Sequence, residues 1–398
     1  MILPPFIAAL CFFLQFALIE NGYYILNMKK HLFYMLTIIA LAAALVSCQS
    51  TDYQGKSMNT LPLDISRDDF TLVSEDDYYD EMKYSVEPYL DSIKRSGTLS
   101  ASRDGHRIYY ETFKSGEESR GSVVILHGFT EFIRKYSEII YYFNQQGYDV
   151  YMIEHYGHGY SERRSDVGDN LSKVAVDEFE VYTDDLKQFM DEVVIPESKG
   201  RKLVLFAHSM GGGIGTRFLE LYPEIFDYAV LSSPMIGINT NGIPEWIAKF
   251  ISGSANLFGA GDGYVFGHYD WDAVESFSDP SCPATSYPRY YYFFEMRKED
   301  EYHQTYGATW SWLNASLKAT EKMVKKSEAE KVEIPVLMLQ AEVDSLVRND
   351  RQLEFASRAK NVHVVKCPDA HHEIFNSPDA IANAYWVTVF DFLDGVLK

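Results

Sequence analysis

Residues 203–213 read Leu-Val-Leu-Phe-Ala-His-Ser-Met-Gly-Gly-Gly, an apolar run that ends at a serine followed by three glycines. The run predicts a short buried strand, and the residues after Gly215 favour a helix. A strand, a sharp turn at Ser209 and a helix form a nucleophile elbow, in which small residues let the helix pack close to the strand. A phosphate-binding loop is the weaker interpretation, because no Lys-Ser or Lys-Thr pair follows the glycines.

Short apolar runs alternate with helical patterns along most of the chain. Strands are expected at 107–113, 123–126, 150–153, 203–207, 228–232, 336–339 and 362–365, and helices at 134–146, 177–193 and 380–393. Runs that are apolar on both faces and alternate with helices predict an open, mostly parallel sheet covered by helices on each side. The expected fold class is therefore α/β.

One segment, residues 239–333, interrupts this alternation and is dense in aromatic residues. Roughly ninety residues between two sheet strands are too many for a loop, so we expect an inserted helical cap. The predicted core is then residues 101–238 together with 334–398. A cap over the strand ends would supply an apolar cleft that suits an acyl chain.

The N-terminus has the composition of an export signal. Residues 1–47 contain a short cationic start at Met28 and an apolar segment that ends in Leu-Val-Ser before Cys48. This pattern resembles a bacterial lipoprotein signal, in which the cysteine is lipidated, so we expect translation to start at Met28 and the protein to be anchored in the cell envelope. The alternatives are an ordinary transmembrane helix, or a membrane span formed by the upstream apolar residues 2–19. Residues 48–100 are expected to be a tether followed by an acidic lead-in, either helical or solvated.

Composition excludes some functions and leaves others open. A formal net charge of −21 leaves no basic stripe for nucleic acid. Four cysteines in 398 residues are no disulfide framework, and whether Cys282 and Cys367 pair is open. The oligomeric state is open as well.

Two later strand ends carry the partners that a nucleophilic serine needs. A serine hydroxyl requires a base to take its proton and an acid to orient that base, and in a parallel-sheet hydrolase these follow in the order Ser, acid, His. The strand at 336–339 leads to Glu342 and Asp344, and the strand at 362–365 leads to His371 and His372. Spacing alone leaves both choices open.

The negative charge that develops on a substrate oxygen needs backbone N–H donors. One is expected from Met210, directly after the serine, and the other from Phe129, after the strand that ends at Leu126. Adjacent histidines also occur in metal sites, but no H-E-x-x-H spacing or second acidic cluster accompanies them here. We therefore expect no metal and no other cofactor.

Taken together, these motifs resemble those of the α/β-hydrolase superfamily, and within it the bacterial lysophospholipase and monoacylglycerol lipase group. The resemblance runs from about residue 100 to the C-terminus. It rests on L-H-G-F-T-E at 126–131, E-H-Y-G-H-G-Y-S at 154–161, A-H-S-M-G-G at 207–212, L-Q-A-E-V-D at 339–344 and A-H-H-E-I-F at 370–375. The segments S-Y-P-R-Y at 286–290 and Y-G-A-T-W at 306–310 look like the lysophospholipase branch. The family pattern implies Asp344 as the acid and His372 as the base.

The chain departs from the family pattern at two places. Ala207 stands where a glycine is usual, and Glu154-His155-Tyr156 stands where Asp-x-Arg is common. The first change is expected to be tolerated, and the second to alter a turn near the cleft.

The resemblance implies a membrane-tethered serine ester hydrolase acting on fatty-acyl esters of lysophospholipids or monoacylglycerols. A serine peptidase or a small-ester esterase on the same fold is the alternative, because fold does not fix the substrate. A non-catalytic lipoprotein that binds lipid under its cap is the third hypothesis.

Overall fold

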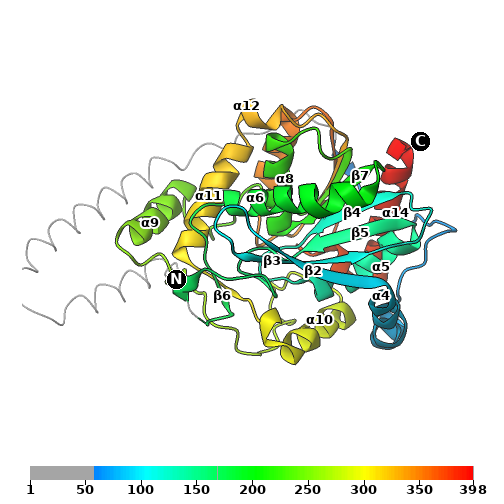
Figure 1. Cartoon of the computed structure of the whole chain (residues 1–398), viewed down its shortest axis with the longest axis horizontal. Helices are drawn as coiled ribbons and strands as arrows, with labels where there is room; N and C mark the ends of the chain where they lie inside the picture. The colour runs from blue at the N-terminus through cyan, green and yellow to red at the C-terminus, as the bar shows by residue number, and fades with distance from the viewer. Residues whose placement is uncertain (1–57, 168, 398) are drawn as a thin grey trace, which may run out of the picture. The chain divides into compact units, whose positions relative to one another are not determined.

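A nine-stranded sheet runs through the part of the chain that the computed structural model describes, residues 58–167 and 169–397 (Figure 1). Its order is β1-β11-β10-β8-β7-β4-β5-β3-β2. Every neighbouring pair from β1 to β5 is parallel, and β3 and β2 form an antiparallel edge. The strands are β1 (Met58–Thr60), β2 (Lys94–Ser100), β3 (Arg107–Phe113), β4 (Gly121–Leu126), β5 (Tyr148–Ile153), β7 (Leu203–His208), β8 (Tyr228–Ser232), β10 (Val336–Ala341) and β11 (Val362–Cys367). A second, two-stranded sheet pairs β6 (Lys173–Val174) with β9 (Gly307–Ala308).

Helices cover both faces of the large sheet, and further helices belong to the insertion at 239–333. They are α3 (Tyr78–Glu81), α4 (Glu87–Ile93), α5 (Ser137–Gln145), α6 (Glu180–Phe189), α7 (Ile195–Ser198), α8 (Ser209–Leu221), α9 (Glu245–Leu257), α10 (Tyr287–Glu299), α11 (Trp310–Met323), α12 (Lys326–Ala329), α13 (Asn349–Arg358) and α14 (Asp379–Leu397). Short 3₁₀ or π turns connect or extend them: η1 (Glu75–Asp77), η2 (Met82–Val86), η3 (Ile133–Tyr136), η4 (Ser165–Val167), η5 (Met190–Val194), η6 (Glu301–His303) and η7 (Ile374–Asn376).

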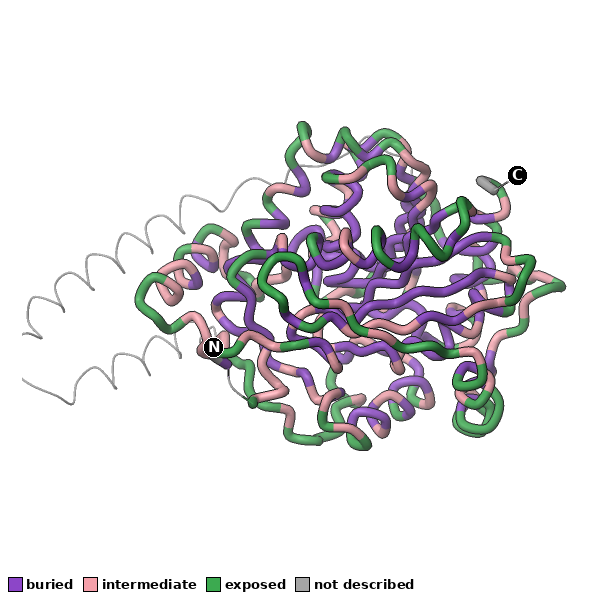
Figure 2. The backbone as a smooth tube through the Cα atoms, in the orientation of Figure 1, coloured by how far each residue is buried: buried purple, intermediate pink, exposed green. Residues whose placement is uncertain are grey.

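The alternation of side chains along the strands explains the two helical layers. In β4, Val124 and Leu126 join a core cluster with α6, α8, α11 and α13, whereas Val123 and Ile125 join another with α5 and α14. The central strands are buried along their whole length (Figure 2). The predicted α/β class, with a mostly parallel sheet between helices, is confirmed.

The predicted export signal and lipidation segment, with Met28 and Cys48, lies outside the described residues. Within 58–167 and 169–397, no helix combines the length and the apolar character that a membrane span requires. Residues 101–238, 239–333 and 334–398 lie in one compact unit of the chain.

Two strands of the large sheet, and both short strands of the small one, were not predicted from sequence patterns. All three residues of β1 are exposed, and the strand pairs with β11 at the sheet edge, where Met58 lies opposite Val364. At the other edge, β2 alternates between exposed and half-buried residues. Edge strands are held by backbone hydrogen bonds and need no continuous apolar run, so hydrophobic periodicity carries little signal for them.

The acidic segment between β1 and β2 is helical and contacts both the core and α10. The buried ring of Tyr78 packs 5.1 Å from the Arg289 guanidinium, and its hydroxyl donates to Glu138 on α5 at 2.8 Å. Arg289, on α10, in turn donates to the Val73 carbonyl at 2.7 Å. This segment therefore ties α10 to the body of the sheet.

The insertion at 239–333 contains α9, α10, β9, α11 and α12. Its aromatic residues divide into two sets, because Tyr290 and Phe294 of α10 are buried in a small cluster with Cys282, whereas Leu257 and Phe258 at the end of α9 are 80% and 83% exposed. The inner face of α11 belongs to the large core cluster.

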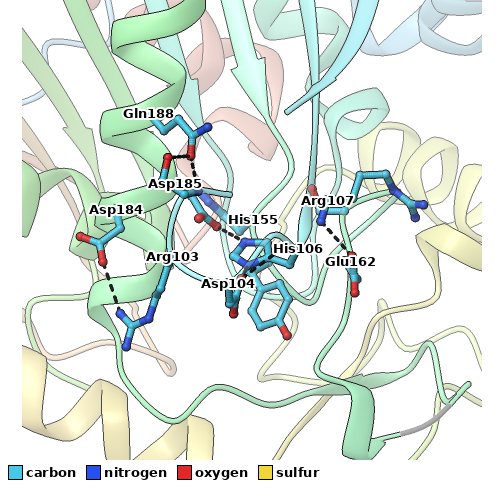
Figure 3. A network of polar contacts seen from close by, with 12 residues as sticks. Arg103, Asp104, His106, Arg107, His155, Glu162, Asp184, Asp185 and Gln188 are labelled. Atoms are coloured by element: carbon cyan, nitrogen blue, oxygen red, sulfur yellow. Dashed lines mark hydrogen bonds and ion pairs between the residues drawn. The ribbon is translucent and has the colours of Figure 1, made fainter. Parts of the chain in front are cut away.

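The turn between β2 and β3 is fixed to α6 through a buried histidine (Figure 3). The two ring nitrogens of His106 contact the carboxylates of Asp104 at 2.5 Å and Asp185 at 2.9 Å. Burial alone would lower the pKa of His106, but hydrogen bonds to both carboxylates and their charges outweigh it and raise that pKa. A charged pair therefore holds the antiparallel edge against the helix layer.

Candidate active site

The parallel order of the sheet brings four loops to one edge. The strands β11, β10, β8, β7 and β4 are consecutive neighbours, so their C-terminal ends lie side by side. The loops after β4, β7, β10 and β11 carry the predicted site residues. Ligands of open parallel sheets bind at this edge.

Ser209 lies at a strained turn between β7 and α8. Its φ is +52°, in the left-handed region that a residue with a side chain rarely adopts. Gly211 is required behind it, because a Cβ there would lie 2.2 Å from the Leu126 carbonyl oxygen. Gly212 likewise allows the close approach of Pro234, 2.7 Å from a Cβ position. The tight packing that the glycine run predicted is present.

Gly215 explains why Ala207 is tolerated where a glycine is usual. A Cβ at residue 215 would lie 3.3 Å from the Ala207 Cβ and 2.8 Å from Leu205 Cδ2. The missing side chain on the helix thus leaves room for the extra methyl group on the strand.

Three predicted side chains form one hydrogen-bonded chain. The Ser209 hydroxyl lies 2.7 Å from His372 Nε2, and His372 Nδ1 lies 2.7 Å from Asp344 Oδ2. Ser209 is 8% exposed and His372 3% exposed, and the Asp344 side chain is fully buried. With the hydroxyl donating to Nε2 and Nδ1–H donating to the carboxylate, this is the arrangement that activates a serine.

The charges of the buried pair reinforce each other. Burial alone would lower the pKa of His372, but the charge and hydrogen bond of Asp344 raise it above the usual value. Burial alone would raise the pKa of Asp344, but His372 and the amides of Val347 and Leu346, each donating at 2.9 Å, lower it. The carboxylate thus stays ionised beside the imidazole.

The alternative acid, Glu342, and the alternative base, His371, form contacts away from Ser209. Glu342 is exposed, pairs with Lys366 at 2.5 Å and accepts from the Asp369 amide. His371 Nδ1 lies 2.7 Å from the Cys282 carbonyl oxygen, so its ring contacts the insertion rather than Ser209. Cys282 and Cys367 are both free, buried thiols.

The two predicted oxyanion donors belong to two chain segments next to the serine. Met210 follows Ser209 in the first turn of α8 and is fully buried. Phe129 follows Gly128, where a Cβ would lie 3.1 Å from the Ser209 Cβ, so the loop after β4 passes directly beside the nucleophile. The Phe129 ring packs on Trp312 of α11, with ring centroids 4.2 Å apart.

A buried ion cluster joins these loops, and sequence reasoning missed it. Lys135 Nζ lies 2.7 Å from Glu131 Oε1 and 2.6 Å from Glu373 Oε1, with the lysine and both acids almost fully buried. Glu131 also accepts from the Gly128 amide and, at 2.6 Å, from the Tyr136 hydroxyl. The only sequence signal was the i, i+4 spacing of Glu131 and Lys135.

The same cluster resembles a metal site in composition. Ligand atoms of Glu131, His208 and Glu373 lie within 4.8 Å of one another. The Lys135 ammonium already bridges the two carboxylates and supplies the positive charge. Burial lowers the pKa of His208 to about 4, so its ring is neutral at ordinary pH. These donors fit an internal ion cluster better than a resident metal.

The turn at 154–161 supports the loop after β4. The His155 amide donates to His127 Nε2 at 3.0 Å, and the Glu154 carboxylate accepts from the Ile133 amide at 3.2 Å. Burial raises the pKa of Glu154 to about 8. The departure from the family pattern at this turn thus places buried polar groups against the backbone beside Phe129.

Known sequences resemble this chain over most of its length. A family model described as serine aminopeptidase, S33 matches residues 117–379. The chain is 29% identical over 299 residues to the probable lysophospholipase L2 of Haemophilus influenzae, which covers 74% of this chain and 91% of that protein. It is 31% identical over 282 residues to lysophospholipase L2 of Escherichia coli K12, with 68% and 80% covered.

Solved structures resemble the fold. A soluble variant of the monoglyceride lipase from Saccharomyces cerevisiae, in complex with a substrate analog, superposes with a TM-score of 0.62 at 16% identity and covers 79% of this chain and 98% of that one. The expected α/β-hydrolase fold is therefore confirmed.

The packing of Ala207 on Gly215 predicts a coupled pair of substitutions. Gly215→Ala should lower the free energy of unfolding by about 1–3 kcal/mol, because the new methyl group overpacks against Leu205 and Ala207. Adding Ala207→Gly should recover part of that loss. Urea unfolding of both single variants and the double variant measures the coupling, and strictly additive effects would contradict it.

Lys135→Met should leave two buried carboxylates without their cation and cost about 3–5 kcal/mol of unfolding free energy. Lys202→Met is the matched control, since Lys202 pairs with Asp227 on the surface. Its removal should change stability little. Equal losses of unfolding free energy in the two variants, measured by chemical denaturation, would show that the buried cluster stabilises the fold no more than a surface ion pair does.

Proposed function

Because the chain belongs to the serine aminopeptidase S33 family and is an ester hydrolase of the lysophospholipase and monoacylglycerol lipase type, we propose that it hydrolyses fatty-acyl esters of lysophospholipids or monoacylglycerols through an acyl-enzyme on Ser209. The observation that carries the proposal is the hydrogen-bonded chain from Ser209 through His372 to Asp344, two links of 2.7 Å each.

The proposed reaction has two halves, acylation and deacylation of Ser209, and His372 and Asp344 take part in both. Ser209 Oγ attacks the ester carbonyl carbon while its proton moves to His372 Nε2. His372 then gives that proton to the departing glycerol oxygen, and the C–O bond of the ester breaks. In the second half, water attacks the acyl carbon while its proton moves to His372. The bond from that carbon to Ser209 Oγ then breaks, His372 returns the proton to Oγ, and the fatty acid leaves. Asp344 stabilises the imidazolium that forms in both halves.

The amides of Phe129 and Met210 are proposed to stabilise the oxyanion. Donors placed before the reaction need no reorganisation when charge develops, and removing one such donor costs roughly 10²–10³ in turnover. The cluster of Lys135, Glu131 and Glu373 supports this role, because it holds the Gly128 amide and the residue after His372.

A lipid substrate is supported by the relatives and by the residues near the serine. Matching proteins are named lysophospholipase L2, and another is named monoacylglycerol lipase. Phe129 and Trp312 place two packed, mutually tilted aromatic rings at the loop that carries the proposed oxyanion donor. Both are suited to an acyl chain.

Membrane tethering is a further part of the proposal. The signal pattern before Cys48 and the polar residues after it support a lipoprotein of the cell envelope. A lipid anchor would hold the enzyme at the surface into which acyl esters partition.

A serine peptidase is the second candidate, favoured by the description of the matching family model. An aminopeptidase must bind the free ammonium of its substrate, and such sites use carboxylates. Glu131 and Glu373 are the buried carboxylates close to the serine loop, and Lys135 already pairs with both. The ester substrates are therefore preferred.

The nucleophile and base are tested by labelling and turnover. A fluorophosphonate probe should label the wild type but not Ser209→Ala. The His372→Ala variant should show a kcat on acyl esters that is roughly 10⁴- to 10⁶-fold lower than that of the wild type. His371→Ala, the adjacent control, should keep much of its turnover because its ring contacts Cys282.

The outcomes separate the candidates. Folded wild-type protein that takes no label would falsify the enzyme mechanism and favour a lipid-binding role. A panel of lysophospholipids, monoacylglycerols, short esters and aminoacyl anilides, compared by kcat/KM, distinguishes lipase from esterase and peptidase.

The anchor is tested by fractionation. Cys48→Ser should move the protein from the membrane fraction to the soluble fraction, because the variant loses its acylation site. Unchanged membrane association would mean that an uncleaved N-terminal span, rather than a lipid, holds the protein.

A further inference from the structure

Arg297 on α10 is a buried cation without an ion-pair partner among the described residues. The residue is 7% exposed, and its side chain makes one hydrogen bond to the described residues, from Nη2 to the Thr130 carbonyl oxygen at 2.7 Å. Its Nε is buried and has no hydrogen-bond partner within residues 58–167 and 169–397. A buried guanidinium normally finds carboxylates, because the charge is costly to remove from water.

A second arginine on the same helix shows the ordinary solution. Arg289 is 1% exposed, and its guanidinium contacts Asp379 at 3.0 Å, Glu138 at 3.5 Å and the Val73 carbonyl at 2.7 Å. The Nε of Arg289, like that of Arg297, has no hydrogen-bond partner among the described residues, but two carboxylates and a carbonyl oxygen lie within 3.5 Å of its guanidinium nitrogens. Arg297, eight residues further along α10, has one carbonyl.

The acids near Arg297 are already committed. Glu131 and Glu373 influence its charge electrostatically, but Lys135 bridges them and Asn376 donates to Glu373 at 2.6 Å. Burial lowers the pKa of Arg297 to about 10, which still leaves it charged at neutral pH. Arg297 therefore remains a positive group with no carboxylate of its own among the described residues.

The position of Arg297 relates it to the chemistry. Thr130 directly follows Phe129, so the guanidinium is one hydrogen bond away from the loop with the proposed oxyanion donor.

We propose that Arg297 is a specificity-determining residue that binds the phosphate of a lysophospholipid headgroup while the ester lies at Ser209. The inference rests on the proposed function. A guanidinium offers several N–H donors in a planar fork that matches phosphate oxygens. A lysophospholipid carries that phosphate on the glycerol that leaves, whereas a monoacylglycerol carries only hydroxyl groups there. Arg297 should therefore raise kcat/KM for the phosphorylated ester relative to the monoacylglycerol.

The test compares two substrates with one acyl chain. Arg297→Met keeps an unbranched apolar side chain and removes the charged guanidinium, whose central carbon lies 4.7 Å from the Phe293 ring centroid. Its kcat/KM on oleoyl lysophosphatidylethanolamine should fall about 10- to 100-fold relative to that on monooleoylglycerol in the same mixed micelles. Arg297→Lys, which retains a charge without the fork, should lie between wild type and Arg297→Met.

Lys298→Met is the matched control, because Lys298 is the next residue of α10, with a 45% exposed side chain paired to Glu295. It makes the same charge change on the surface and should leave the substrate ratio unchanged. Circular dichroism melts establish that each variant is folded.

Several outcomes would overturn the proposal. Equal loss on both substrates would show that Arg297 only holds the Thr130 carbonyl, and an unchanged ratio would show that the phosphate lies elsewhere. The same shift in Lys298→Met would assign the effect to surface charge. Wild-type protein that labels at Ser209 but prefers the monoacylglycerol would overturn this inference alone, and wild-type protein that turns over neither ester would overturn the proposed function with it.

Discussion

The geometry of the site depends on two buried ion pairs, which the Lys135 ammonium forms with the carboxylates of Glu131 and Glu373. Glu131 belongs to the loop after β4 and fixes the Gly128 amide, and Glu373 follows His372 in the loop after β11. A buried charge with only one partner would be costly, so the three groups stabilise one another only when both loops are in place. The cluster thereby couples the proposed oxyanion loop to the proposed base.

Sequence reasoning recovers the parts of this architecture that depend on local pattern. Buried parallel strands are continuous apolar runs, so β4, β5, β7, β8, β10 and β11 were predictable, as was the strained turn at Ser209 from its glycines. The edge strands β1 and β2 were not, because backbone pairing leaves little trace in side-chain periodicity. The helices before β2 were one of two open alternatives for an acidic segment.

In the candidate site, too, only the features with a local sequence pattern could be predicted. The order Ser209, Asp344, His372 could be predicted because a parallel sheet places consecutive strand ends at one edge. The choice between neighbours needed the family pattern, since Glu342 and His371 differ from their neighbours by the direction of the side chain rather than by chemistry. In the structure Glu342 points to Lys366 and His371 to Cys282. The ion cluster joins residues separated by 238 positions and leaves no local signal beyond one helical spacing.

The two buried arginines of α10 differ in the number of oxygen atoms that meet their guanidinium groups. Both are cations in a helix of the insertion, and composition does not distinguish them. Arg289 meets oxygens from α5, from α14 and from the N-terminal segment, and those contacts offset the cost of burying its charge without any ligand. Arg297 meets a single carbonyl, and that carbonyl belongs to the loop beside the nucleophile. A protein rarely leaves a buried charge half satisfied, because desolvation is not offset by one neutral hydrogen bond. In the proposed reaction, the phosphate on the leaving glycerol of an acyl ester at Ser209 is the anion that this guanidinium would bind.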